Sequence, residues 1–384
     1  MSDFYMEMFL IPVILLALLV HFWGTSRNRR KARKWMAVHQ PLLETEYALV
    51  GYHRQPKITP YSEGTQGDSL LEVSNKLTGD NLAEDLIKEQ SGWEFQTYAS
   101  GRQNVAFADF KVLLKRRANP FAMIGEELAG MFFESIKPKP ERMEAVIYTF
   151  DGNEKNFVPA NVPGTDEIEK PKPIGNSSYD GFILAIVDKM SMRRFRNDRY
   201  DASLTFTKDH AKLPDWAIVM SESAEISDTV LTKDLIAALE KAGGLFEYLI
   251  ITDQPTDKPT TLDETKPKKR IHISIKLPSD GNYLPILPLF QQFLRLPDFL
   301  VAQAHFRPEV TKKIARTREE EKSKIKKVSD KEAEEERLKQ LDTLKKSERD
   351  RKLKGMSAEE QKKYLEREAE KNRKKQEKKM TKRG

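Results

Sequence analysis

The stretch EMFLIPVILLALLVHFWGTSRNRRKARKW (residues 7–35) joins an apolar run directly to a basic run. Phe9 to Trp23 is apolar apart from His21, and the apolar character reaches back toward residue 4. This window of about 20 residues approaches the length that crosses a hydrocarbon core about 30 Å thick. The stretch therefore predicts a transmembrane helix over residues 9–23.

Two other interpretations of this stretch fit less well. A cleaved signal peptide carries positive charge before its apolar run and a small-residue cleavage site after it. Here Asp3 and Glu7 come before the run, and the positive charges come after it. A helix of a soluble core would show a polar face in its middle turns, whereas residues 11–20 have none. We therefore expect a retained anchor.

The basic residues after the apolar run predict its orientation. Lysine and arginine close to a transmembrane segment stay on the cytosolic side. Residues 1–8 then form a short luminal N-terminus and the bulk of the chain is cytosolic, in agreement with the absence of cysteine. The residues that would hold this topology and contact lipid headgroups lie in a basic juxtamembrane helix over residues 24–41: Arg27, Arg29, Arg30, Lys31, Arg33 and Lys34.

Charge is distributed unevenly along the rest of the chain. Residues 307–384 contain 29 Lys and Arg against 18 Asp and Glu, a net charge of +11, although the whole chain has only +7. Residues 1–306 are therefore net acidic, and the basic C-terminal arm suggests a partner of negative charge. Between the juxtamembrane helix and this arm, residues 42–306 have the size and apolar content of a globular cytosolic domain.

Strand and helix patterns are mixed in this domain without regular β-α-β repetition, which predicts an α+β fold. Strands are expected over residues 47–52, 93–100, 105–114, 144–150, 182–187, 245–252 and 270–277, and over 216–220, where a loop is the alternative. Helices are expected over residues 120–135, 229–242 and 283–304, the last containing prolines that can break it.

The C-terminal arm, residues 307–384, predicts a long charged helical or coiled-coil extension. It is rich in Glu, Lys and Arg, which are good helix formers. Leu338, Leu341 and Leu344 do not continue into the three or four apolar heptads of a two-stranded coiled coil, so single helices with i,i+4 ion pairs fit better. Gly355, followed by Ser357 and Glu360, predicts a helix stop and a capping box.

The residue types of common catalytic and metal sites are absent or scattered. Without cysteine the chain has no thiol nucleophile and no cysteine-ligated metal site. The six histidines form no H-E-x-x-H pair, and no phosphate-binding glycine loop or G-x-S-x-G motif occurs. We therefore expect a protein that is not an enzyme and that binds no metal and no cofactor.

One helical stretch, NPFAMIGEELAGMFFESI (residues 119–136), has an apolar stripe whose role the sequence leaves open. Packing in the core is slightly favoured. An interfacial or partner-binding helix is the alternative, because the stripe is rich in Met and Phe. The stripe consists of Phe121, Ile124, Leu128, Met131 and Phe132.

The basic arm has three interpretations. A solvated charged helix needs no partner, contacts with phosphates would bind the arm to the RNA of a membrane-bound ribosome, and anionic lipid is a further acceptor. From Lys371 onward the chain has eight basic residues and one acidic residue, which favours a phosphate-bearing partner. The alternative function is a general membrane tether whose basic tail binds anionic lipid or RNA.

Three segments resemble the calumin family, also called coiled-coil domain-containing protein 47. They are LLETEYALVG (residues 42–51), LPDWAIVMSESAEISDTVL (213–231) and MSAEEQKKYLEREAEKNRKKQEKKM (356–380). Their order and spacing match the family, and the middle segment is the most specific. The resemblance covers most of the chain.

The resemblance implies an endoplasmic reticulum membrane protein of the PAT complex, an intramembrane chaperone that assists insertion and folding of multipass membrane proteins. The implied partners are an Asterix-type small membrane protein, the Sec translocon channel, the ribosome near its exit tunnel, nascent multipass membrane proteins and the lipid bilayer. Because the C-terminal helices of the family approach the ribosome, the implied ribosome-binding residues are Lys371, Arg373, Lys374, Lys375, Lys378 and Lys379.

The chain departs from the family in front of the membrane helix. Animal members have a long acidic luminal segment there, linked to low-affinity calcium binding, whereas about eight residues precede Phe9 here. Calcium sites need several convergent carboxylates. We therefore do not expect calcium storage, and we expect little of this chain to act in the lumen.

Overall fold

The computed structural model of the chain describes residues 2–52, 86–132, 140–150 and 178–354, together with 359, 362, 363, 366, 367, 370, 373 and 374. These residues belong to two compact units. The first comprises residues 1–259 and 263–319, and the second comprises 260–262 and 320–384. The predicted helix stop at Gly355 and capping box at Ser357 and Glu360 lie outside the described residues.

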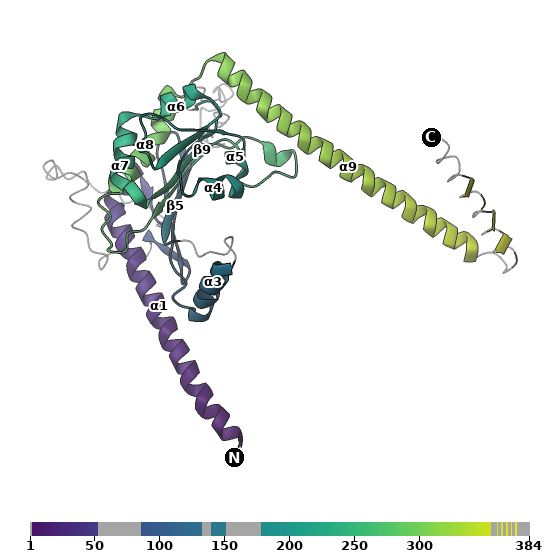
Figure 1. Ribbon diagram of the computed structural model, residues 1–384, viewed down its shortest axis with the longest axis horizontal. Helices are drawn as coiled ribbons and strands as arrows, with labels where there is room; N and C mark the ends of the chain where they lie inside the picture. Colours follow the sequence, from purple (N-terminus) through teal and green to yellow (C-terminus); the bar gives the residue numbers. More distant parts are fainter. Residues whose placement is uncertain are drawn as a thin grey trace, which may run out of the picture. The chain divides into compact units, whose positions relative to one another are not determined.

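An antiparallel sheet forms the centre of the first unit (Figure 1). In the described residues its strand order is β1-β3-β4-β5-β10-β9-β6-β8-β7, and β2 pairs with β3 beside this path. Every one of these pairings is antiparallel, so the predicted α+β class is confirmed. The strands are β1 (Leu49–Val50), β2 (Lys88–Ser91), β3 (Glu94–Ser100), β4 (Val105–Leu113), β5 (Arg142–Thr149), β6 (Leu184–Asp188), β7 (Phe206–Lys208), β8 (Ala217–Ser221), β9 (Phe246–Thr252) and β10 (Arg270–Lys276).

Helices precede, interrupt and follow this sheet along the chain. They are α1 (Ser2–Glu46), α3 (Pro120–Phe132), α4 (Met192–Asp198), α5 (Tyr200–Ser203), α6 (Ala224–Val230), α7 (Lys233–Ala242), α8 (Leu287–Gln303) and α9 (Pro308–Lys354), with short 3₁₀ turns η6 (Gly243–Leu245) and η7 (Asp263–Thr265).

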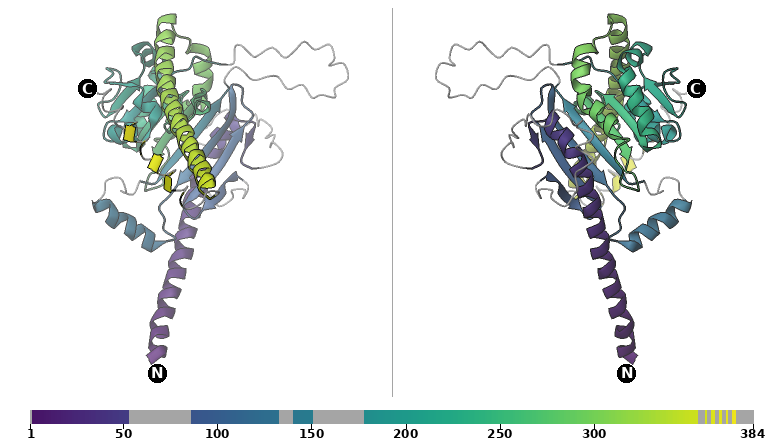
Figure 2. Two further views of the ribbon diagram at one scale, coloured as in Figure 1. Left: turned by 90° about the vertical axis from the view of Figure 1, so that its right-hand side faces the viewer. Right: turned by 90° about the vertical axis from the view of Figure 1, so that its left-hand side faces the viewer.

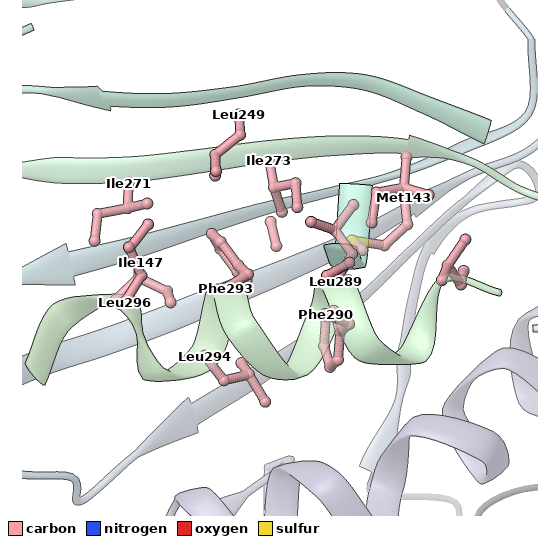
Figure 3. Packing of buried hydrophobic residues seen from close by; sticks show 14 of the residues in the cluster. Met143, Ile147, Leu249, Ile271, Ile273, Leu289, Phe290, Phe293, Leu294 and Leu296 are labelled. Atoms are coloured by element: carbon pink, nitrogen blue, oxygen red, sulfur yellow. The ribbon is translucent and has the colours of Figure 1, made fainter. Parts of the chain in front are cut away.

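Side-chain alternation decides which face of the sheet packs on helices. Every second residue of β3 and β5 is buried, as expected for strands with one covered face. Figure 3 shows Leu289 and Phe293 of α8 pointing toward the sheet residues Ile147 and Ile273. β6 is buried on both faces, because α4 and α5 cover the opposite side through residues such as Phe195.

One long helix, α1, contains both the apolar run and the basic run (Figure 1). Most large apolar side chains between Leu10 and Trp23 are exposed, by 47–67%. Among the described residues, α1 is the one helix with the length and apolar composition to cross a membrane. The predicted N-terminal apolar helix is therefore present.

The second half of α1 is part of the domain core. Trp35 is fully buried and stacks on His39, with ring centroids 4.6 Å apart. His39 in turn meets Phe290 of α8 edge to face at 4.7 Å. The core thus includes residues of the predicted juxtamembrane helix and begins before residue 42, where the sequence placed the start of the domain.

Two predicted helices differ from the structure. Residues 229–242 form parts of two helices, α6 and α7, because the chain turns at Leu231 and Thr232 caps α7 by accepting a hydrogen bond from the Leu235 N–H at 3.2 Å. The helix predicted over 283–304 begins only at Leu287, and it continues through Pro297 without a break. The segment 216–220 lies almost entirely in a strand, β8, rather than in a loop.

A buried ionic cluster holds the first turns of α9 on the domain. The guanidinium of Arg318 contacts the carboxylate of Glu222 at 2.7 Å and that of Asp253 at 3.0 Å. Glu222 also accepts a hydrogen bond from the Ile183 N–H at 2.9 Å. The three charged side chains are at most 10% exposed, so the cluster belongs to the interior of the first unit.

Candidate functional site

The candidate site lies where α1 leaves the domain. It contains predicted headgroup residues of α1 and the base of α3, the predicted interfacial or partner-binding helix. Here the exposed apolar run of α1 gives way to its basic run, and the segment 115–119, which connects β4 to α3, crosses the helix. We call these elements the α1–α3 junction: residues 21–31 of α1, segment 115–119 and Glu141. Figure 2 shows α3 projecting from the domain close to α1 at this level.

Segment 115–119 packs directly against the backbone of α1 at Gly24, where no side chain would fit. A Cβ atom on Gly24 would lie 2.4 Å from the carbonyl oxygen of Arg117 and 2.8 Å from the amide nitrogen of Ala118. The Nδ1 atom of His21 lies 3.2 Å from the carbonyl oxygen of Ala118. Only glycine at position 24 permits this contact, so the start of α3 is fixed against the end of the apolar run.

Polar side chains join the two elements one turn further along α1. The amide of Asn28 donates to the carbonyl oxygens of Gly92 at 2.7 Å and Lys115 at 3.0 Å, and its own oxygen accepts from Arg117 at 2.8 Å. Glu141 pairs with Arg117 and receives the ammonium of Lys31 at 2.6 Å. The network fixes α1 and the base of α3 to the same end of the sheet.

Glu141 determines how the stability of this junction depends on pH. Burial would raise the pKa of its carboxyl group, but hydrogen bonds from Lys31 and Arg117 outweigh burial and lower this pKa from 4.5 to about 2. When the folded-state pKa of a carboxyl group is lowered, its ionised form stabilises the folded protein at every pH above the unfolded-state pKa. For Glu141 this stability is lost as pH falls from about 4.5 toward 2. We expect Glu141→Gln to lower the free energy of unfolding by about 2 kcal/mol at neutral pH and to flatten its acid dependence.

Denaturant unfolding of detergent-solubilised protein, followed by tryptophan fluorescence from about pH 3 to pH 7, measures this effect. Glu89→Gln is the matched control, because Glu89 pairs with Arg29 of the same helix at 2.7 Å but both side chains are more exposed. Such a pair contributes less than about 1 kcal/mol. Equal effects of the two substitutions would contradict the role of Glu141.

The six predicted headgroup residues occupy different surroundings along α1. Arg29 and Lys31 pair with carboxylates of the domain, whereas Arg27 stacks over the ring of Trp23 at 5.3 Å. Arg30, Arg33 and Lys34 are exposed. Their contact with lipid headgroups remains a prediction.

The apolar stripe of α3 is exposed rather than buried. The side chains of Phe121, Ile124, Leu128, Met131 and Phe132 are between 52% and 82% exposed. Packing in the core of the domain, the interpretation that the sequence slightly favoured, is therefore wrong for this stripe. The sequence prediction of an interfacial or partner-binding helix stays open to test.

The predicted ribosome-binding residues lie in the second unit. Arg373 and Lys374 are in helical conformation, and the ammonium of Lys374 contacts the carboxylate of Glu370 at 2.9 Å. The remaining four, Lys371, Lys375, Lys378 and Lys379, lie outside the described residues.

Within the ranges that the structure describes, no group of three or more His, Asp and Glu side chains is placed to hold a metal ion. A cleft of about 530 Å³ lies between α3 and the sheet, with Trp93, Arg116, Met123 and Glu126 among its lining residues. The described side chains that line it carry charges of both signs.

Comparison with known proteins matches nearly the whole chain to one family. The family model described as PAT complex subunit CCDC47 matches residues 3–375. A UPF0674 endoplasmic reticulum membrane protein of Schizosaccharomyces pombe is 24% identical over 326 residues, which cover 82% of this chain and 73% of that protein. A second UPF0674 endoplasmic reticulum membrane protein, from Saccharomyces cerevisiae, is 29% identical over 210 residues, covering 52% of this chain and 49% of the relative.

A PAT complex subunit CCDC47 from Danio rerio is 21% identical over 310 residues, which cover 76% of this chain and 52% of that protein. The matched region therefore spans about half the length of the Saccharomyces cerevisiae and Danio rerio relatives.

Proposed function

The chain belongs to the family of the PAT complex subunit CCDC47, and on that premise we propose that it is a non-catalytic endoplasmic reticulum membrane protein that assists insertion and folding of multipass membrane proteins. The match over residues 3–375 carries this proposal, because it includes the apolar helix, the domain and most of the basic arm. The names of the relatives state a complex subunit or a membrane protein of the endoplasmic reticulum, and none names a reaction.

The proposed orientation places the domain and the basic arm in the cytosol. The support is the charge asymmetry of α1, whose basic residues all follow the exposed apolar run. The α1–α3 junction lies at the boundary between these two runs, so in this orientation the domain begins directly at the membrane surface.

The basic arm is proposed to contact the ribosome. Its net charge of +11 and the concentration of positive charge beyond Lys371 suit phosphate groups of ribosomal RNA. Within the assembly we propose an Asterix-type small membrane protein, the Sec channel and nascent multipass proteins as further partners. Family membership is the support for each of these three.

Deletion of residues 356–384 tests the ribosome contact. Sealed microsomes that contain the full chain are expected to bind added ribosomes in a salt-sensitive manner, and the deletion is expected to lower this co-sedimentation several-fold. The physical reason is that Lys and Arg contacts with phosphate release counterions, which makes affinity depend steeply on charge number and salt. An arm on the luminal side would be unreachable, so the same measurement tests the orientation.

A matched pair of variants separates position from total charge. In the first, Gln replaces the six predicted ribosome-binding residues. In the second, Gln replaces six basic residues of α9: Lys322, Lys324, Lys326, Lys327, Lys331 and Lys339. The first is expected to reduce binding much more than the second, because the predicted contacts lie at the end of the arm. Unchanged ribosome binding, together with flotation on anionic liposomes, would instead support the tether that binds lipid.

A further inference from the structure

The helix α3 turns its apolar side away from the domain. A surface helix of a globular protein normally buries its apolar stripe on the core. In α3 the stripe of Phe121, Ile124, Leu128, Met131 and Phe132 is exposed throughout, and a Cβ atom on Gly125 would meet no atom within 4 Å. Such a contiguous apolar surface marks a contact with a partner or a membrane.

The opposite side of α3 explains why the stripe faces outward. Met123 and Glu126 line the cleft between α3 and the sheet. The carboxylate of Glu126 pairs with the guanidinium of Arg116 at 2.6 Å, and Arg116 itself lies 4.8 Å from the centroid of the Trp93 ring. The domain therefore holds α3 by its polar side.

The position of α3 is set by α1. The contacts of Gly24 and His21 with Arg117 and Ala118 place the base of α3 at the last turn of the exposed apolar run. Trp23, beside this turn, and the guanidinium of Arg27 over its ring have the composition of a membrane–water boundary. The base of the helix that carries the exposed stripe thus lies against the last turn of the apolar run of α1.

We propose that α3 lies in the interface of the leaflet from which α1 emerges, with its apolar stripe among the lipid acyl chains near the headgroups. An interfacial helix buries its apolar face about 5–10 Å into this boundary. The charge pattern fits this occupant, since Arg27, Arg30 and Lys115 are exposed near the junction, where the Lys115 carbonyl accepts from Asn28, and they suit lipid phosphates. The acidic Glu126 lies on the side of α3 that faces the domain, where it pairs with Arg116.

The contact of α3 with lipid would fix the orientation of the domain about the axis of α1. A single transmembrane helix permits rotation about its own axis, whereas a transmembrane helix and an interfacial helix, joined by the α1–α3 junction, define a plane. The inference needs α1 in a bilayer, but it is independent of the proposed ribosome contact and of any partner in the PAT complex.

Site-directed quenching in lipid-only vesicles tests the proposal. The chain has no cysteine, so Leu128→Cys provides a single labelling site for an environment-sensitive fluorophore. The full-length labelled protein is reconstituted into phosphatidylcholine–phosphatidylserine vesicles that contain lipids with a nitroxide near the headgroup end of the acyl chain. We expect a blue-shifted emission and quenching several-fold stronger than at either of two control positions.

The controls separate lipid contact from exposure. Phe206→Cys places the fluorophore at another exposed aromatic position, beside Lys313 at the base of α9. Met123→Cys places it on the domain side of α3. Equal quenching at positions 123 and 128 would overturn the proposed orientation. A solvent-exposed fluorophore at position 128 in these vesicles would overturn lipid contact, and its protection in native microsomes would then assign the stripe to a protein partner.

Discussion

Replacing Arg318 with methionine is expected to lower the free energy of unfolding of the domain by about 3–5 kcal/mol. The guanidinium is the positive partner of two buried carboxylates, Glu222 and Asp253, at 2.7 and 3.0 Å. Removing it leaves two like charges together in the interior, and an unpaired buried charge is far more unfavourable than a buried pair is favourable. Equilibrium denaturation of the purified protein in detergent measures the change.

The sign of the pH dependence provides a second measurement for the same variant. Burial raises the pKa of Glu222, against the opposing effect of Arg318, so removing Arg318 raises this pKa further. A folded-state pKa above the unfolded value favours the folded state as pH falls. The difference in stability between the native chain and Arg318→Met is therefore expected to shrink from neutral pH toward about pH 5.

Two further variants separate loss of the ionic cluster from loss of side-chain volume. Lys312→Met makes a comparable change to an exposed residue of the same helix and is expected to have little effect. Adding Glu222→Gln and Asp253→Asn to Arg318→Met removes all three charges and is expected to recover much of the stability. Failure of this recovery would show that packing, rather than uncompensated charge, dominates at the base of α9.

The strands could be predicted from the sequence because their burial pattern is local. Alternating burial along β3 and β5 and continuous burial along β6 follow directly from the order of apolar residues. The short strands β2 and β7 were missed, since their residues are mostly exposed and have no apolar pattern. The cap at Thr232 was a visible signal, but the apolar spacing across residues 229–242 concealed the turn.

The polar networks could not be predicted from the sequence. Asn28 and Arg117 are 89 residues apart, and Arg318 and Glu222 are 96 apart. With 66 basic and 59 acidic residues in the chain, the sequence contains far too many possible pairs to select these. The partners become definite only when the sheet places their elements at the same end.

The outward direction of the α3 stripe was also beyond the sequence. Helical periodicity identifies which residues share a face, but it does not show whether that face meets the core or the surroundings. The answer depends on Gly24 and on the pairing of Glu126 with Arg116, both of which are tertiary contacts. By contrast, the core role of α1 had a sequence signal, since Trp35, His39 and Leu42 are spaced three or four residues apart.

Trp35→Ala is expected to destabilise the domain by about 3–5 kcal/mol, the usual range when a fully buried large aromatic side chain is truncated. Trp35 is completely buried, stacks on His39 and lies edge to face with Phe290 at 6.4 Å. The expected result in microsomes is a chain that still resists carbonate extraction but whose domain is cleaved at much lower protease concentrations. Carbonate extraction measures retention in the membrane, and limited proteolysis and thermal unfolding measure the stability of the domain.

Trp23→Ala is the matched control, because it removes the same side chain from the same helix at a position that is 55% exposed. If residues 24–41 were only a linker between anchor and domain, both substitutions would leave the domain equally stable. A large loss of stability at residue 35 and none at residue 23 would support a single helix whose first half is exposed and whose second half belongs to the core of the domain. The angle at which α1 crosses the bilayer would then set the position of the whole sheet, because no flexible joint lies between them.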